Sequence, residues 1–330
     1  MTKKVGINGF GRIGKVVFRL LQTNSNIEVV GINDPMDLLT LVYLLKYDTI
    51  HGRFNGTVSV AENGIIVNDR FIPVSSETAP ENIPWKKWGA DYVIESSGLF
   101  KTKKKLEKHL QAGAKKVILS CPTDDSSIKT VVLGVNENIL TPDDVIVSNA
   151  SCTANCLTPM LKVIDDAFGI ETGFMNTVHP YTNNQRIIDA PHPDIRRSRA
   201  AAYNIIPTTS SAVKSLFAVM PKFKDRFDGF ATRVPVADCS FVELCLNLSS
   251  DVTIEKVNSL MKIASETSCL NLIEYTEDPI VSSDIIDNPH SAVFDSLATK
   301  VIGKRFVQIL AWYDNESGYS NRIVDLISKI

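Results

Sequence analysis

The chain has 330 residues, of which 44% are hydrophobic and 22% are charged, and its formal net charge is −2 at pH 7. This length exceeds one typical core and predicts two domains. The nearly balanced charge does not favour nucleic-acid binding. No hydrophobic run reaches the roughly 18 residues of a membrane-spanning helix. We therefore expect a two-domain protein with neither nucleic acid nor membrane as a partner.

The N-terminal segment has the pattern of a dinucleotide-binding loop. A hydrophobic strand at 4–7 is followed by a G-x-G-x-x-G motif and then by hydrophobic residues at helical spacing. In this context the glycines permit a tight turn that brings a pyrophosphate to the helix N-terminus. The sequence therefore predicts that the cofactor contacts Gly9, Phe10, Gly11, Arg12, Ile13 and Gly14.

An acidic residue stands at the position expected for ribose recognition. The second hydrophobic run, 27–32, is followed closely by Asp34, which lies 20 residues after Gly14. A carboxylate at this spacing accepts hydrogen bonds from the adenosine ribose and repels a 2′-phosphate. NAD is thus favoured over NADP.

Further strand–helix units follow the dinucleotide loop. Strands are predicted at 92–95, 115–120 and 131–135, and a lysine-rich helix at 102–112, whose charges we interpret as a solvated face. Alternating parallel strands and helices indicate an α/β Rossmann-type doubly wound parallel sheet, with ligands at the carboxyl ends of its strands. Ser97, Gly98 and Ser120 occupy such ends and are predicted to contact the cofactor.

Cys152 lies where a strand-like run at 144–148 gives way to a helix-like run at 157–168. A helix N-terminus stabilises a thiolate, so Cys152 is a candidate nucleophile. His179, at the end of the hydrophobic run 173–179, is the candidate base. A nucleophilic cysteine beside a nicotinamide cofactor indicates aldehyde oxidation through a thioester. The alternative is a buried core thiol, which is the interpretation we give to Cys156.

The second half of the chain predicts a different kind of domain. Strands are predicted at 173–179, 229–236, 240–248 and 305–313, and hydrophobic and polar residues partly alternate along them. This pattern indicates a mainly antiparallel sheet in an α+β catalytic domain. We expect a dinucleotide-binding domain at 1–151, completed by a C-terminal helix at 316–330, and a catalytic domain at 152–315. The long polar segment 180–204 is typical of a functional or interface loop.

Cysteine usage argues against metal binding and secretion. The six cysteines show no paired metal-ligand spacing, so we expect no metal. The first strand begins near residue 4 and leaves no room for a signal peptide. We therefore expect reduced thiols in a cytoplasm.

Several motifs together resemble the NAD-dependent, phosphorylating glyceraldehyde-3-phosphate dehydrogenase family. They read Ile-Asn-Gly-Phe-Gly-Arg-Ile-Gly at 7–14, Ala-Ser-Cys-Thr-Ala-Asn-Cys-Leu at 150–157, Val-His-Pro-Tyr-Thr-Asn at 178–183 and Trp-Tyr-Asp-Asn-Glu-Ser-Gly-Tyr-Ser at 312–320. Their order is that of the family, and the resemblance covers essentially the whole chain.

The resemblance implies oxidative phosphorylation of D-glyceraldehyde 3-phosphate to 1,3-bisphosphoglycerate, a step of glycolysis and gluconeogenesis. Cys152 would be the nucleophile and His179 the acid and base. Asn315 and Tyr319 would contact the nicotinamide, and the assembly would be a homotetramer in which the loop at 180–204 lies near a neighbouring subunit's cofactor. The residues implied to bind the two phosphates are Ser151, Thr153, Thr182, Arg197, Ser210 and Arg233.

Other functions remain open at this point. In erythrose-4-phosphate dehydrogenase, a homologous enzyme, water resolves the thioester, and the stretches 192–199 and 288–292 are similar to that branch. A cysteine hydrolase would leave the dinucleotide motif unexplained, and a non-catalytic binding protein would not need Cys152 and His179. Ser211 departs from the glycine usual in the family, which affects the predicted phosphate site.

Overall fold

The computed structural model describes residues 2–330, and the chain divides into two compact units. Unit 1 comprises residues 1–131, 138–150 and 320–330, and unit 2 comprises residues 132–137 and 151–319. Within the described residues, no helix has both the length and the apolar composition that a bilayer span requires.

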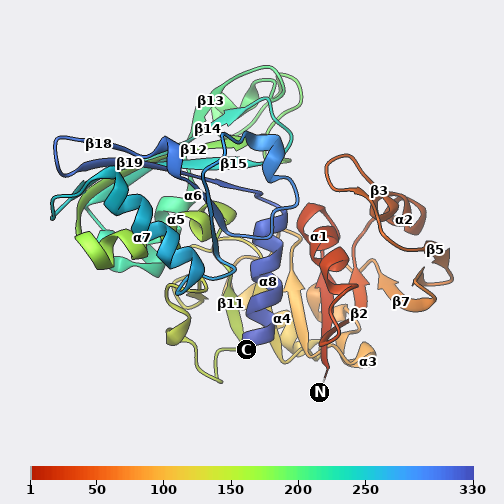
Figure 1. Cartoon of the computed structure of the whole chain (residues 1–330). Coiled ribbons are helices and arrows are strands. Elements are labelled where there is room, and N and C mark those ends of the chain that lie inside the picture. The colour runs from red at the N-terminus through yellow and green to blue at the C-terminus, as the bar shows by residue number, and fades with distance from the viewer. Residues whose placement is uncertain (1) are drawn as a thin grey trace. The chain divides into compact units, whose positions relative to one another are not determined.

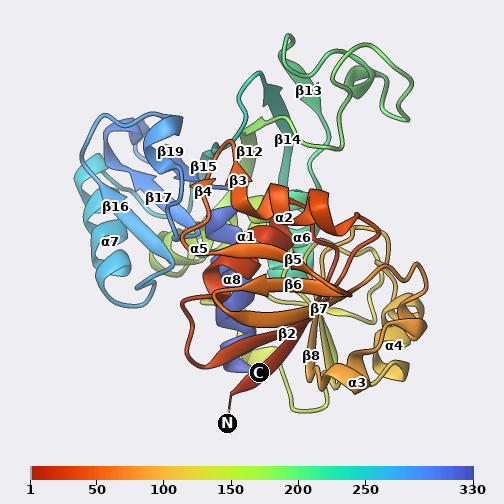
Figure 2. The same cartoon turned by 90° about the vertical axis from the view of Figure 1, so that its right-hand side faces the viewer.

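Unit 1 is built on a nine-stranded sheet with the order β10-β11-β9-β8-β1-β2-β7-β6-β5. Figure 1 labels β11, β2, β7 and β5 of this sheet. The seven strands from β10 to β7 are parallel to their neighbours, whereas β6 and β5 are antiparallel additions beside β7 (Figure 2). The parallel part confirms the predicted doubly wound sheet. The strands are β1 (Lys3–Asn8), β2 (Ile27–Asn33), β5 (Val58–Ala61), β6 (Gly64–Val67), β7 (Arg70–Ser75), β8 (Tyr92–Glu95), β9 (Lys116–Leu119), β10 (Lys129–Thr130) and β11 (Ile146–Ser148), with β3 (Tyr47–Asp48) and β4 (Gly52–Arg53) paired separately.

The helices of unit 1 pack through hydrophobic faces. Val17 and Phe18 of α1 are fully buried, as are Val5 and Ile7 of β1. The ammonium group of Lys3 donates to the carbonyl oxygens of residues 327, 328 and 330, which ties the end of α8 to β1. The helices are α1 (Arg12–Leu21), α2 (Leu38–Lys46), α3 (Trp85–Trp88), α4 (Lys103–Gln111) and the C-terminal part of α8 (Ser317–Lys329).

One strand predicted for this half is wrong. Residues 131–135 are not a strand, because β10 ends at Thr130 and a turn follows. The amide groups of Val135 and Asn136 donate to the carbonyl oxygen of Val132, and the side chain of Asn136 accepts from the Val132 amide. A hydrophobic run can therefore be buried as a turn when its backbone groups bond to one another.

Unit 2 contains an eight-stranded sheet with the order β13-β14-β12-β15-β19-β17-β16, in which β18 pairs with β19. Most neighbours are antiparallel, which confirms the predicted sheet type; β12 with β14 and β16 with β17 are the parallel pairs. The strands are β12 (Ile170–Pro180), β13 (Ile206–Thr208), β14 (Phe227–Val234), β15 (Ser240–Leu248), β16 (Ile273–Thr276), β17 (Ala292–Asp295), β18 (Lys300–Ile302) and β19 (Phe306–Tyr313).

One face of this sheet is covered by α5, which contacts β12, β15 and β19. On β12, alternate residues from Met175 through Thr177 to His179 are buried on that face. The helices of unit 2 are α5 (Cys152–Phe168), α6 (Ser211–Val219), α7 (Ile254–Glu266) and the start of α8. Short 3-10 helices in the chain are η1 (Pro80–Asn82), η2 (Glu137–Ile139), η3 (Ile195–Ser198), η4 (Pro221–Phe223), η5 (Ser282–Ile285) and η6 (Ser296–Ala298).

Candidate active site

The glycine-rich loop of unit 1 leaves an open helix N-terminus. Gly9 has a φ of 90°, and a Cβ atom there would lie 2.4 Å from the amide nitrogen of Ser97. A Cβ atom at Gly14 would lie 2.1 Å from the carbonyl oxygen of Gly9, so both positions require glycine. Gly11, the residue before α1, would meet no atom within 4 Å. Space for an anionic ligand therefore exists beside the first amides of α1.

Asp34 joins two of the predicted cofactor loops. One carboxylate oxygen accepts from the amide of Phe10 at 2.6 Å and the other from the amide of Met36 at 2.9 Å. The acid predicted from spacing thus lies against the glycine-rich loop. Arg12, by contrast, forms an ion pair with Asp48. Ile13 is partly buried, and the ring of Phe10 lies inside the core.

The remaining predicted cofactor residues of unit 1 lie at the carboxyl ends of β8 and β9. Ser97 donates to the Glu95 carboxylate through both its amide and its hydroxyl. Ser120 donates to the carbonyl oxygen of Glu95 through the same two groups. Gly98 has a φ of 74° and open space around its α-carbon. These positions agree with the sheet edge at which parallel sheets bind ligands.

In unit 2, Cys152 is the first residue of the 17-residue helix α5. The hydroxyl of Ser151 caps this helix by accepting from the amide of Ala154 at 3.0 Å. Ala150 has a φ of 56°, so the chain turns sharply just before the helix. The helix begins earlier than the predicted 157–168 because the polar residues after Ser151 belong to its first turn.

The structure brings Cys152 and His179 together. The sulfur of Cys152 lies 3.6 Å from Nε2 of His179. His179 is 5% exposed and lies near the end of β12, on the face that α5 covers. The strand alternation and the helix start therefore produce the pair that the sequence predicted.

Arg233 contacts the other side of the histidine ring. In the parallel register of β14 against β12, Arg233 is the partner of His179. Its Nη1 lies 2.6 Å from Nδ1 of His179 and 2.8 Å from the carbonyl oxygen of Pro180. Nδ1 also lies 2.9 Å from the carbonyl oxygen of Pro180, so its two contacts favour opposite tautomers. Toward Arg233, which only donates, Nδ1 accepts and the ring proton is on Nε2, facing the sulfur; toward Pro180, which only accepts, Nδ1 donates and Nε2 is free of a proton.

Burial shifts the pKa values of both Cys152 and His179 in the direction that disfavours the predicted thiolate–imidazolium pair. Burial raises the pKa of the Cys152 thiol above its ordinary value, although the charge of Arg233 opposes this rise. Burial, followed by the charge of Arg233, lowers the pKa of His179 to about 3. Burial therefore opposes the charged form of both side chains, whereas the start of α5 favours the thiolate.

Tyr313, at the end of β19, was not among the predicted site residues. Its hydroxyl oxygen lies 2.7 Å from Oγ1 of Thr153 and 3.0 Å from Oγ1 of Thr177. Its ring stands edge-on to that of His179, with 6.2 Å between centroids. Alternation along β19 places Tyr313 on the inner face, and that signal was available in the sequence.

The predicted phosphate ligands are brought together only in part. Arg197 donates to Thr208 Oγ1 at 2.9 Å, and its Nε lies 3.5 Å from the carboxylate of Asp194. The charge of Arg197 helps to lower the pKa values of both His179 and Arg233. The guanidinium groups of Arg197 and Arg233 therefore both contribute positive charge around His179.

Three other predicted residues have structural contacts of their own, and a fourth is buried. The hydroxyl of Ser210 caps α6 by accepting from the amide of Ala212 at 3.2 Å. The carbonyl oxygen of Thr182 accepts from the amide of Gln185. Asn315 accepts from Ser240 at 3.0 Å, and Tyr319 is 5% exposed at the end of unit 2.

One buried group of unit 2 has the composition of a metal site. Ligand atoms of Asp238, Cys239 and Asp314 all lie within 4.8 Å of one another. The Asp314 carboxylate already accepts from the amides of residues 287, 316 and 317, around the start of α8. We therefore interpret Asp314 as a residue that satisfies the amides at the start of α8.

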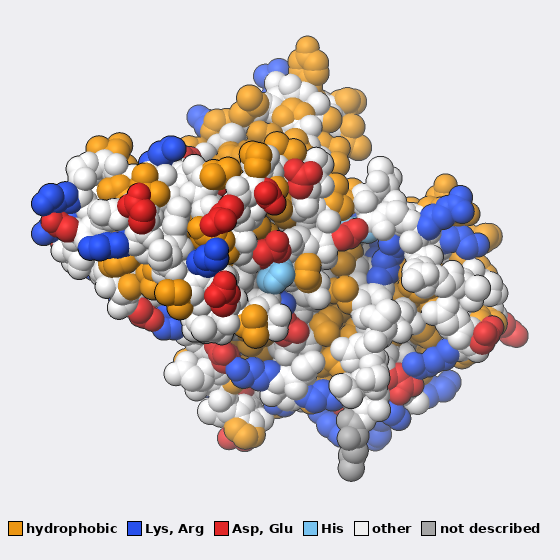
Figure 3. Space-filling model, viewed as in Figure 1, with side chains coloured by type: hydrophobic (Ala, Val, Ile, Leu, Met, Phe, Trp, Pro, Cys, Tyr) orange, Lys and Arg blue, Asp and Glu red, His pale blue; other side chains and the backbone are white. Residues whose placement is uncertain are grey.

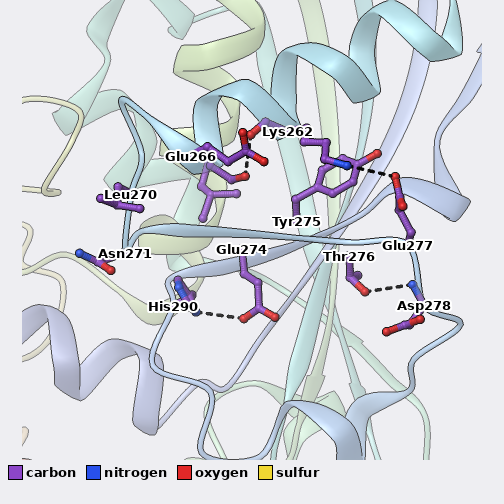
Figure 4. A pocket seen from close by; sticks show the side chains of 12 residues that line it. Lys262, Glu266, Leu270, Asn271, Glu274, Tyr275, Thr276, Glu277, Asp278 and His290 are labelled. Atoms are coloured by element: carbon purple, nitrogen blue, oxygen red, sulfur yellow. Dashed lines mark hydrogen bonds and ion pairs between the residues drawn. The ribbon is translucent and has the colours of Figure 1, made fainter.

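A separate cavity of about 560 Å³ lies between α7 and β16 (Figure 4). Four of its charged side chains make pairs or ring contacts: Lys262 lies 3.6 Å from Glu277 and over the ring of Tyr275, and His290 lies 3.0 Å from Glu274. The residues that line the cavity include neither Cys152 nor His179.

Comparison with known proteins identifies the family. Residues 3–103 match the model of the glyceraldehyde 3-phosphate dehydrogenase NAD binding domain, and residues 151–315 match that of its C-terminal domain. Glyceraldehyde-3-phosphate dehydrogenase 2 of Bacillus subtilis is 49% identical, with 100% of this chain and 97% of the relative covered. The Geobacillus stearothermophilus enzyme is 49% identical (100% and 98% covered), and the Streptomyces coelicolor enzyme is 52% identical (99% and 98%). The chain belongs to the glyceraldehyde-3-phosphate dehydrogenase family.

Proposed function

We propose that this protein oxidises D-glyceraldehyde 3-phosphate with NAD and inorganic phosphate, giving 1,3-bisphosphoglycerate. The observation that carries the proposal is the contact between Cys152 and His179 beside Arg233, in a chain that matches both domains of the family. The proposal assigns NAD binding to residues 1–151 with the helix at 316–330, and the chemistry to residues 152–315.

In this proposal Cys152 forms the covalent intermediates. Its sulfur adds to the aldehyde carbon, and the resulting thiohemiacetal is oxidised to a thioester. His179 takes the thiol proton, holds the substrate oxygen and returns a proton when the thioester is resolved. To take a proton at Nε2, the ring must release Nδ1 from Arg233 and donate from Nδ1 to the carbonyl oxygen of Pro180, which lies 2.9 Å away.

Two phosphate groups must then be held near the sulfur, one on the substrate and one that attacks the thioester. Arg233 and Arg197 supply planar, charged donors suited to phosphate oxygens. We assign supporting roles to Ser151, Thr153, Thr182 and Ser210. An anion that draws Arg233 away from His179 also removes the contact that keeps Nδ1 an acceptor.

NAD fits the residues of unit 1. The space beside Gly11 and the amides of α1 suit a pyrophosphate, and the Asp34 carboxylate suits ribose hydroxyls. When bound, NAD supplies the hydride acceptor. Gly9, Phe10, Arg12, Ile13, Gly14, Ser97, Gly98 and Ser120 would line the site, with Asn315 and Tyr319 at the nicotinamide.

The proposed function is tested by phosphate dependence. We expect purified protein to form NADH continuously from glyceraldehyde 3-phosphate when inorganic phosphate is present and to stop after a brief burst when it is absent. Acyl phosphate should accumulate in step with NADH. Equal turnover without phosphate would instead mean that water resolves the thioester, and erythrose 4-phosphate would then be the substrate to assay.

Asp34→Asn should weaken NAD binding and reduce discrimination against NADP. The amide keeps an acceptor for the Phe10 amide, directs an N–H group at the Met36 amide, and loses the charge that repels a 2′-phosphate. We expect the Kd for NAD, measured by calorimetry, to rise by roughly tenfold, which is about 1.4 kcal/mol, while NADP binding improves. Asp37→Asn is the matched control, since Asp37 caps α2 and asparagine caps equally well. An unchanged NAD-to-NADP preference would rule out the assignment.

We further propose a cytoplasmic homotetramer. Large hydrophobic side chains are exposed along the segment that precedes β13, and they gather at the top of the space-filling view (Figure 3). They are Ile187, Ile188, Ile195, Tyr203 and Ile205, each at least 70% exposed. Several exposed large hydrophobic side chains on one segment favour burial against another subunit.

A further inference from the structure

Three neighbouring strands of unit 1 end in buried polar side chains. In the order β8-β1-β2, the last residues are Glu95, Asn8 and Asn33, which are 0%, 3% and 2% exposed. Each precedes one of the loops that we assign to the NAD site. The three side chains form one series of hydrogen bonds across the sheet edge. The groups at its two ends determine which side chain donates and which accepts in each bond.

The β2 end is oriented by backbone groups. Oδ1 of Asn33 accepts from the amide of Glu77 at 2.9 Å, and Nδ2 donates to the carbonyl oxygen of Glu77 at 2.9 Å. Backbone groups cannot exchange these roles, so the Asn33 amide cannot be flipped. Its Nδ2 also donates to Oδ1 of Asn8 at 2.8 Å, which leaves Nδ2 of Asn8 to donate to Glu95 at 2.5 Å.

The opposite end is oriented by an indole. Nε1 of Trp85 lies 3.1 Å from Nδ1 of His109, which is fully buried. Because an indole N–H only donates, Nδ1 of His109 accepts. The ring is therefore neutral, with its proton on Nε2, which lies 3.0 Å from the Glu95 carboxylate. His109 thus approaches Glu95 as an uncharged donor.

Every group that meets Glu95 therefore acts as a donor. Asn8 and His109 donate to Oε2, while the amide and the hydroxyl of Ser97 donate to Oε1. This inventory matches the carboxylate form, and no cationic side chain pairs with it within residues 2–330. A buried charge held only by neutral donors is costly, and such arrangements occur where function depends on them.

We propose that Glu95 is a positioning residue for NAD binding. By accepting from Asn8, His109 and Ser97 it links β1, α4 and the loop after β8. It thereby sets the relative positions of the glycine-rich loop and the Ser97–Gly98 turn. Glu95 acts through these loops and need not touch the cofactor. The inference rests on the proposed function, because it concerns the NAD site named there.

The test is direct calorimetric titration of the full-length protein with NAD. Glu95→Gln keeps the shape but directs an N–H group at neighbours that already donate. We expect its Kd for NAD to rise at least tenfold, with the KM for the aldehyde within twofold of the unaltered protein. Glu81→Gln is the control, because it removes an equal charge from an exposed residue paired with Lys108 of α4. It should leave NAD binding unchanged.

A second substitution tests the direction of the chain. Trp85→Phe removes the indole N–H, so His109 can move its proton to Nδ1 and accept at Nε2. Alone, this change should alter the NAD Kd by no more than about twofold, since the Nε2–H form still suits Glu95. The double variant, Trp85→Phe with Glu95→Gln, should bind NAD at least threefold more tightly than Glu95→Gln alone. The reason is that the introduced amide then has Nε2 of His109 as an acceptor.

The outcomes are separable. If the unaltered protein binds NAD and folded Glu95→Gln binds it within twofold as tightly, the positioning role is wrong. If the double variant binds no more tightly than Glu95→Gln, the deduced direction is wrong. Absence of NAD binding by the unaltered protein would overturn the proposed function and this inference with it. Should Glu95→Gln not fold, Asn8→Ala removes one donor without adding another; it should raise the NAD Kd at least threefold, and unchanged binding there would overturn the role.

Discussion

Cys152→Ser should lower turnover of glyceraldehyde 3-phosphate by a factor on the order of 10³ or more. A serine hydroxyl at the start of α5 is far less readily ionised than a thiol. The ester that it would form is also resolved less readily than a thioester, because an alkoxide is a poorer leaving group than a thiolate. The substitution removes little volume and leaves the Ser151 cap in place. We expect NAD binding to stay within about twofold, as measured by calorimetry, while NADH formation collapses.

The same substitution one helical turn further provides the control. Cys156 is fully buried, and burial raises the pKa of its thiol well above the ordinary value. Cys156→Ser should therefore keep turnover near that of the unaltered protein while destabilising the fold by about 1–3 kcal/mol, because a hydroxyl is buried in an apolar site. Loss of turnover in Cys156→Ser alone would contradict the assignment of the nucleophile, as would sustained turnover in Cys152→Ser.

The parts of the site that the sequence predicted are those with local signals. The glycine-rich loop, the acid 20 residues after it and the cysteine at a strand–helix junction each depend on residues close in the chain. The alternation of hydrophobic residues likewise predicted a strand at 240–248, and the structure has β15 at Ser240–Leu248. These features require no knowledge of which strands pair.

The parts that were not predicted depend on pairing across long stretches of chain. Arg233 reaches His179 because β14 runs parallel to β12 in one particular register, within a sheet predicted to be mainly antiparallel. Tyr313 reaches Thr153 because β19 and α5 meet across 160 residues. The pKa directions of Cys152 and His179 follow from the same contacts and from burial, neither of which has a local signature.

His179→Leu should reduce turnover by a factor of about 10²–10⁴, because general acid–base catalysis at the sulfur and the substrate oxygen is lost. Leucine fills a similar volume on the buried face of β12 but offers neither a donor nor a base. His290→Leu is the matched control, since that ring pairs with Glu274 beside the α7–β16 cavity. Turnover within tenfold of the unaltered protein in His179→Leu would exclude the histidine as acid and base.

The pH dependence of Cys152 alkylation gives the same variant a second readout. Burial raises the pKa of the thiol, so the rate with iodoacetamide should increase with pH as thiolate forms. His179, whose pKa is lowered to about 3, stays neutral from pH 5 upward, and when Arg233 donates to its Nδ1 the Nε2–H group stabilises the thiolate. Removing that donor disfavours the charged form, so the alkylation profile of His179→Leu should move to higher pH. A shift to lower pH would mean that His179 opposes ionisation of Cys152.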